Sequence, residues 1–211
     1  MQTHIKICGL TRPQDVETAL RCGANMLGFI VEAESSRKLD VETAARISRP
    51  ASGCAKIVAV TVNADAELLR NICSEMRPNF LQMHGDESPK WLSEVKAFTG
   101  LPIIKAVAVR DRNDLERAKT FENCADYILL DAKAPKGDVQ RGGHGLAFDW
   151  ALLKGFSTKV PLILAGGLNL DNIRAAKATG LNFFDVSSGV EAAPGIKDHE
   201  KIQAFMKAAH E

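Results

Sequence analysis

The chain has 211 residues, and its 27 basic and 26 acidic side chains leave a formal net charge of +1. This near balance gives no basis for electrostatic recognition of nucleic acid or of an anionic membrane, so we expect neither as a partner. The length suits one domain with a substantial core, and we predict a single domain over residues 1–211.

The cysteines and the N-terminus point to one compartment. An odd number of cysteines without Cys-x-x-Cys or Cys/His spacing favours neither a disulfide framework nor a zinc site. They are Cys8, Cys22, Cys54, Cys73 and Cys124. The N-terminus lacks a basic region followed by an apolar one, and no apolar run reaches transmembrane length. We therefore expect a cytoplasmic protein.

Apolar or β-branched runs alternate with amphipathic segments along the chain, which is the pattern of repeated βα units. We predict eight strands, over residues 5–8, 26–31, 57–62, 80–83, 103–109, 127–130, 162–165 and 183–186. A helix is predicted after each strand, over residues 13–21, 41–48, 66–76, 89–98, 112–121, 148–153, 170–178 and 197–209.

Eight continuously apolar strands in a chain of this length favour an α/β fold, a (β/α)8 TIM barrel with its active site at the C-terminal ends of the strands. The alternative is an open doubly wound sheet, but no Gly-x-Gly-x-x-Gly turn follows the first strand. The longest predicted loop, residues 132–146, is rich in glycine and is interpreted as a functional loop. Whether it closes over a ligand stays open.

In such a barrel the ends of all strands meet at one mouth, so the residues found there should converge. Reading that position in each unit gives Cys8, Glu32, Asn63, His84, Arg110, Asp131, Gly166, Gly167, Ser187, Ser188 and Gly189.

Cys8 and Asp131 are the candidate proton-transfer groups. Cys8 ends the first strand beside Lys6 and before a helix, two influences that favour a thiolate. Asp131 ends an apolar strand, where burial can raise the pKa of a carboxyl and make it a general acid. The alternatives are a buried structural cysteine and an aspartate bonded to its own loop.

Two further side chains are candidate ligand contacts. Arg37, in the loop after the second strand, could pair bidentately with a substrate carboxylate, or it could be a solvated arginine in a charged loop. His84 is interpreted as a hydrogen-bonding wall of the site.

The last two units carry glycine-rich turns at the place where barrel enzymes hold phosphate. These turns are Gly166-Gly167 and, within residues 185–198, Ser188-Gly189. Glycine also serves tight turns, but two such turns in consecutive units favour a phosphate site.

Motifs along nearly the whole chain resemble those of the phosphoribosylanthranilate isomerase family of tryptophan biosynthesis. They are Lys6-Ile-Cys-Gly-Leu-Thr11, Gln82-Met-His-Gly-Asp-Glu87, Leu130-Asp-Ala-Lys133, Gly142-Gly-His-Gly-Leu-Ala-Phe-Asp-Trp150, Leu164-Ala-Gly-Gly-Leu168, Asp185-Val-Ser-Ser-Gly-Val-Glu191 and Pro194-Gly-Ile-Lys-Asp198.

The resemblance implies an Amadori rearrangement of N-(5-phosphoribosyl)anthranilate, with no cofactor and no metal. It implies Asp131 as general acid, Cys8 as general base and Arg37 as the contact of the substrate carboxylate. It also implies phosphate binding at Gly166, Gly167, Ser188 and Gly189, with Asp185 near the sugar.

The chain departs from the family around the second strand. Ser36 replaces a common proline, and Glu32 and Glu34 stand where apolar or aromatic residues are usual. Arg37 is retained, so the carboxylate contact remains predicted, whereas packing against the aromatic ring does not follow.

Two alternatives of other kinds remain. An epimerase-like phosphosugar barrel enzyme should show paired His and Asp metal ligands at strand ends, and a noncatalytic phosphometabolite-binding protein needs neither Cys8 nor Asp131. We expect a monomer, with a homodimer through the strand-end loops as the alternative.

Overall fold

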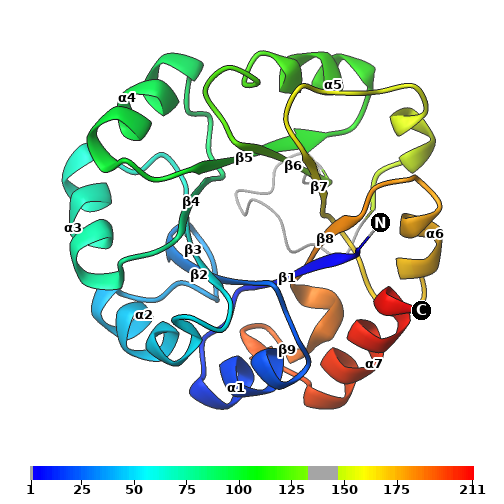
Figure 1. The fold of residues 1–211 in the computed structure, drawn as a ribbon, viewed down its shortest axis with the longest axis horizontal. Helices are drawn as coiled ribbons and strands as arrows, with labels where there is room; N and C mark the ends of the chain where they lie inside the picture. Colours follow the sequence, from blue (N-terminus) through cyan, green and yellow to red (C-terminus); the bar gives the residue numbers. More distant parts are fainter. Residues whose placement is uncertain (1, 133–146) are drawn as a thin grey trace.

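The computed structural model describes residues 2–132 and 147–211. Eight parallel strands follow one another around a closed barrel, in which β1 pairs with both β2 and β8 (Figure 1). This closure confirms the predicted barrel and excludes the open sheet. The strands are β1 (His4–Cys8), β2 (Met26–Glu32), β3 (Lys56–Thr61), β4 (Phe80–Met83), β5 (Ile103–Val109), β6 (Tyr127–Ala132), β7 (Leu162–Leu164) and β8 (Phe183–Val186).

Helices surround the barrel on the outside (Figure 1). They are α1 (Pro13–Arg21), α2 (Val41–Ser48), α3 (Ala66–Met76), α4 (Pro89–Thr99), α5 (Arg112–Lys119), α6 (Ile173–Lys177) and α7 (His199–His210). Short 3-10 turns occur at η1 (Arg49–Ala51), η2 (Trp150–Leu153) and η3 (Ser188–Val190), and β9 (Glu191–Ala193) pairs with β10 (Ile196–Lys197) in a small hairpin before α7.

Local chemistry explains where the helices begin. Asp40, Asp65, Ser88, Asp111 and Asp198 each precede a helix, and their side chains accept hydrogen bonds from backbone N–H groups of its first turn.

Two predicted helices are clearly shorter than expected, whereas α5 ends only two residues early. Residues 148–153 form only the 3-10 turn η2, and residues 170–178 are helical only over α6. The Asn169 side chain accepts from the N–H groups of Asp171 and Asn172, and Asn172 donates to the Gly167 carbonyl. These side-chain bonds compete with helical backbone bonds and delay the start of α6.

Alternation along the strands decides which side chains enter the barrel. On β1, Ile5 and Ile7 pack in the apolar layer under the helices, whereas Cys8 belongs to a second cluster that includes Val58, Leu129 and other side chains of the barrel interior. Polar residues at interior positions near the C-terminal strand ends therefore face one another. Among the described residues, no helix combines the length and apolar character needed to span a membrane.

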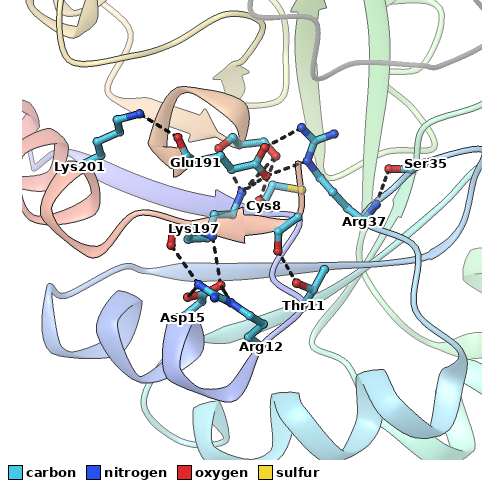
Figure 2. A network of polar contacts seen from close by, with 11 residues as sticks. Cys8, Thr11, Arg12, Asp15, Ser35, Arg37, Glu191, Lys197 and Lys201 are labelled. Atoms are coloured by element: carbon cyan, nitrogen blue, oxygen red, sulfur yellow. Dashed lines mark hydrogen bonds and ion pairs between the residues drawn. The ribbon is translucent and has the colours of Figure 1, made fainter. Parts of the chain in front are cut away.

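A buried carboxylate ties the N-terminal helix to the C-terminal hairpin (Figure 2). Asp15 on α1 accepts from Arg12 Nε and Nη2 at 2.9 and 2.7 Å and from the backbone N–H of Lys197 at 3.2 Å, and it contacts His199 Nε2 at 2.9 Å. Burial alone would raise the pKa of the Asp15 carboxyl, but the bonds with Arg12 and His199 hold it below its ordinary value. Asp15 thus stabilises the fold as a carboxylate.

We expect Asp15→Asn to lower the free energy of unfolding by about 2–4 kcal/mol, because an amide turns one acceptor oxygen into a donor facing Arg12 or Lys197. Urea unfolding at neutral pH measures this. Because folding lowers the pKa of Asp15, its stabilising contribution is present at pH above the unfolded-state pKa and is lost as the pH falls through the folded-state pKa. The free energies of unfolding of variant and wild type should therefore converge in strongly acid solution.

Glu17→Gln, a change of the same chemical kind at an exposed position of α1, is the matched control and should leave stability nearly unchanged. An unfolding free energy of Asp15→Asn equal to that of the wild type would contradict the stabilising role.

Candidate active site

A cavity of about 680 Å³, open to solvent, lies among the C-terminal ends of the barrel strands. Eight of the nine predicted site residues line it, namely Cys8, Arg37, His84, Asp131, Gly166, Gly167, Asp185 and Ser188. The barrel thus brings together positions that are up to 180 residues apart in the chain.

The ninth predicted site residue, Gly189, does not line the cavity. A Cβ atom at Gly189 would lie 1.9 Å from the Leu168 carbonyl oxygen, so this glycine permits close packing of the last two strand-end loops. Three other strand-end residues also lie away from the cavity lining, namely Glu32, Asn63 and Arg110.

Cys8, Lys6 and Asp185 form a buried group at the junction of β1 and β8. Lys6 and Asp185 are register partners, and Lys6 Nζ donates to Asp185 Oδ1 at 3.0 Å from a fully buried position. Burial would lower the pKa of the Lys6 ammonium, but Asp185 and Cys8 together offset this and leave the pKa raised. Burial also raises the pKa of the Asp185 carboxyl, against the opposing effect of Lys6.

Gly28 gives this group its space. It is the register partner of Cys8 on β2, and a Cβ atom there would lie 2.8 Å from Cys8 Sγ and 3.1 Å from Lys6 Nζ. Because Gly28 has no side chain, the Cys8 thiol and the Lys6 ammonium can both lie close to its backbone.

The expectation that its surroundings lower the pKa of the Cys8 thiol, and so favour a thiolate, is wrong. Burial raises the pKa of the Cys8 thiol above its ordinary value, although Lys6 and Lys197 act to lower it. The sequence indicated the favourable influence of Lys6 but not the desolvation of a side chain that is only 7% exposed.

Asp131 is held by two contacts. Its Oδ1 accepts from the N–H of Ala132 at 2.9 Å, and its Oδ2 lies 3.2 Å from His84 Nε2. Gln82 Nε2 lies 3.0 Å from His84 Nδ1, an arrangement that makes Nδ1 the acceptor and leaves the ring proton on Nε2, toward Asp131. His84 and Gln82 thus orient the carboxyl group.

Arg37 is neither solvated nor free. It is buried, and its Nε and Nη2 atoms donate to the two carboxylate oxygens of Glu191 at 2.8 and 2.7 Å. Figure 2 shows Arg37, Glu191 and Lys197 meeting beside Cys8. The alternative of a solvated arginine is therefore wrong, while binding of a substrate carboxylate stays a prediction.

The Gly166-Gly167 turn has the backbone conformation that only glycine adopts readily, with φ of +80° and +65°. A Cβ atom at Gly166 would lie 2.3 Å from the Ala132 nitrogen and 2.9 Å from Asp131 Oδ1. This glycine therefore lets the β7 turn pass directly beside the candidate acid.

Sequence reasoning missed the roles of Gln82, Glu191 and Lys197 around these residues. Gln82 could have been found, because alternation along β4 puts it on the same face as His84. Nothing local in the sequence pairs Glu191 with Arg37, which lies 154 positions earlier. Except for Ala132, the predicted functional loop 132–146 lies in residues 133–146, outside those that the structure describes.

The family model of N-(5'-phosphoribosyl)anthranilate isomerase matches residues 5–208 of this chain. The chain belongs to this family. An N-(5'-phosphoribosyl)anthranilate isomerase of Agrobacterium fabrum is 45% identical over 212 aligned residues, which cover 100% of this chain and 96% of the relative.

Solved structures of the family have the same fold. A phosphoribosyl anthranilate isomerase in complex with reduced 1-(o-carboxyphenylamino)-1-deoxyribulose 5-phosphate is 34% identical, with a TM-score of 0.86 and coverage of 99% of this chain and 98% of the other. Monomers generated from the dimeric Thermotoga maritima enzyme are also 34% identical, with a TM-score of 0.85 and the same coverage. The isomerase described here is thus an enzyme of tryptophan biosynthesis.

We expect Lys6→Met to raise the pH midpoint of Cys8 thiolate formation in the isomerase further, because the variant loses the Lys6 ammonium that lowers it. The pH dependence of iodoacetamide labelling, resolved by peptide mass spectrometry, measures this midpoint. Exposed Cys54 in the same protein is the internal control.

Lys6→Arg, which keeps the positive charge, should shift the midpoint less. Since Lys6→Met also leaves Asp185 without its ammonium partner, Gly28→Ala provides a second test: its methyl group should push Lys6 and Cys8 apart and shift the midpoint upward. An unchanged labelling profile in both Lys6→Met and Gly28→Ala would refute the role of Lys6.

Proposed function

We propose that the chain converts N-(5'-phosphoribosyl)anthranilate to 1-(o-carboxyphenylamino)-1-deoxyribulose 5-phosphate by an Amadori rearrangement. The observation that carries the proposal is that Cys8 and Asp131 line one cavity together with the two glycine-rich turns and Arg37. The related structure that holds a reduced form of this product supports the choice of substrate.

Asp131 is the proposed general acid. It donates a proton to the ring oxygen of the ribose as the bond between this oxygen and the first carbon breaks, and the nitrogen lone pair forms an iminium. His84 Nε2, 3.2 Å from Asp131 Oδ2, orients the carboxyl group for this donation. Because Gly166 has no side chain, it can lie close to Asp131 without covering the Asp131 carboxyl, which lines the cavity.

Cys8 is the proposed general base. The thiolate takes the proton from the second sugar carbon, and the electrons of that C–H bond move toward the iminium nitrogen to give an enolamine, which tautomerises to the ketone. The iminium is the electron sink, so the reaction as proposed needs neither a metal nor a pyridoxal-type cofactor. Lys6 supports this role because its ammonium stabilises the thiolate against burial.

The two ends of the substrate carry charges that different parts of the cavity can bind. We assign the phosphate to the backbone around Gly166, Gly167 and Ser188, and the anthranilate carboxylate to Arg37. Gly189 does not contact the phosphate in this arrangement; it lets the two loops approach each other. The sugar then lies near His84 and Asp185.

The residues around the end of the second strand that differ from the family do not add negative charge to the cavity lining. Glu32 and Glu34 are outside the lining, and Glu32 pairs with Lys38 at 2.9 Å. Apolar side chains from β2, β3 and the residue that follows β3, namely Ile30, Val60 and Val62, line the cavity and can pack against the aromatic ring.

We propose a single barrel domain over residues 1–211 and a cytoplasmic location, the latter supported by five free cysteines. A monomer remains the expectation for this chain, although the Thermotoga maritima relative is described as dimeric.

Removal of either proton-transfer group should abolish most turnover while leaving binding intact. We expect Cys8→Ser and Asp131→Asn each to lower kcat by roughly two to four orders of magnitude. A coupled assay with freshly made phosphoribosylanthranilate measures turnover, and calorimetric titration with the reduced product measures binding. Cys54→Ser, at an exposed thiol, is the matched control and should retain full activity.

Full activity in either variant would remove that residue from the mechanism. An inactive wild-type enzyme in the same assay would overturn the proposed reaction itself.

A further inference from the structure

Glu191 occupies one edge of the Arg37 guanidinium, and no other side chain within residues 2–132 and 147–211 bonds to the guanidinium, which leaves the second edge for a ligand. The carboxylate takes the Nε–H and one Nη2–H in a bidentate contact, with distances of 2.8 and 2.7 Å. A guanidinium has five N–H groups, so the Nη1 group and the second Nη2–H remain for a carboxylate that approaches end-on. Arg37 itself lines the cavity.

The Arg37 side chain reaches this position through a narrow passage. A Cβ atom at Gly9 would lie 2.6 Å from Arg37 Cδ, and the φ of +71° at Gly9 disfavours other residues. The backbone N–H of Arg37 donates to Ser35 Oγ at 3.1 Å. The backbone of Arg37 is therefore held by Ser35, its stem passes Gly9 closely, and Glu191 holds its end.

A carboxylate beside the arginine would by itself weaken the attraction for an anionic substrate. Lys197 compensates for this: its fully buried Nζ donates to Glu191 Oε1 at 2.8 Å and to the Ser187 carbonyl at 3.0 Å. Burial alone would raise the pKa of the Glu191 carboxyl, but Arg37 and Lys197 hold it below its ordinary value. Burial lowers the pKa of the Lys197 ammonium, and Glu191 opposes this shift. With both cations charged, the three side chains carry a net charge of +1.

Lys197 is itself anchored to the rest of the fold (Figure 2). Its backbone carbonyl accepts from Arg12 Nη2 at 3.0 Å, and its backbone N–H donates to Asp15. Lys201 Nζ donates to the Glu191 carbonyl at 2.8 Å. The hairpin that carries Glu191 is thus fixed at both ends, which suits a group that must hold another side chain in one orientation.

We propose that Glu191 is a positioning residue that directs the free edge of Arg37 at the aromatic carboxylate of the substrate, with Lys197 supplying the charge that Glu191 cancels. This inference rests on the proposed function, because it takes the anthranilate carboxylate as the ligand of Arg37. It makes the enzyme's preference for a substrate with this carboxylate depend on a residue that does not touch the substrate.

Charge and geometry predict opposite results for Glu191→Gln. Removal of the negative charge leaves a more positive site, which by electrostatics alone would tighten binding of an anion. If Glu191 acts by positioning, the glutamine N–H faces Arg37 donors, one of the two bonds is lost and the carboxylate-bearing ligand binds more weakly.

Two probes measured by calorimetric titration separate these outcomes. They are reduced 1-(o-carboxyphenylamino)-1-deoxyribulose 5-phosphate and the same compound without its carboxyl group. We expect Glu191→Gln to weaken the first probe about tenfold, and the second by less than about twofold. Glu191→Asp, which keeps the charge but shortens the reach, should weaken the first probe similarly.

The matched control is Glu32→Gln, which removes a carboxylate from a half-exposed ion pair with Lys38 in the same loop region. It should change neither affinity by more than about twofold, because exposed pairs contribute little. Unchanged or tighter binding of the carboxylate probe by Glu191→Gln would overturn the positioning role, and so would an equal loss of both probes.

Failure of the proposed function gives a different pattern. A wild-type enzyme that binds neither probe contradicts the proposed substrate. A wild type that binds both equally contradicts the carboxylate contact of Arg37, and with it the inference about Glu191.

Discussion

The site depends on the buried ion pair between Lys6 and Asp185, which joins the first and last strands where the barrel closes. The two residues are 179 positions apart, yet closure makes them register partners that face the interior. A fully buried ammonium is costly without a partner. The same ammonium lies beside Cys8, so barrel closure supplies the charge that the proposed base needs.

Three polar side chains at the mouth that the mechanism uses are each held by another side chain. Lys6 is held by Asp185, Asp131 contacts His84, and Arg37 is gripped by Glu191. These pairs fix the orientation of each group before a substrate binds, which lowers the cost of assembling the transition state. Gly9, Gly28 and Gly166 complement them, because they leave open the space beside Arg37, Lys6 and Asp131.

The strands and the polar residues at their ends could be predicted from the sequence, because parallel strands read as continuous apolar runs and barrel topology sends their ends to one mouth. Pairings between distant segments could not: Glu191 carries no local signal that it contacts Arg37. The net rise in the pKa of the Cys8 thiol could not be predicted from the sequence either, because desolvation depends on how the interior packs. Helix α6 begins late because Asn169 and Asn172 bond locally, which amphipathic periodicity does not register.

Two anion-binding ends of the cavity, the glycine-rich turns and Arg37, set the position at which the sugar meets Cys8 and Asp131. The most direct test is a crystal structure of this enzyme with reduced 1-(o-carboxyphenylamino)-1-deoxyribulose 5-phosphate. We predict the phosphate at Gly167 and Ser188, the carboxylate on the free edge of Arg37, and Cys8 Sγ within about 4 Å of the second sugar carbon. A ligand bound in the reverse direction, or with that carbon far from Cys8, would contradict the account.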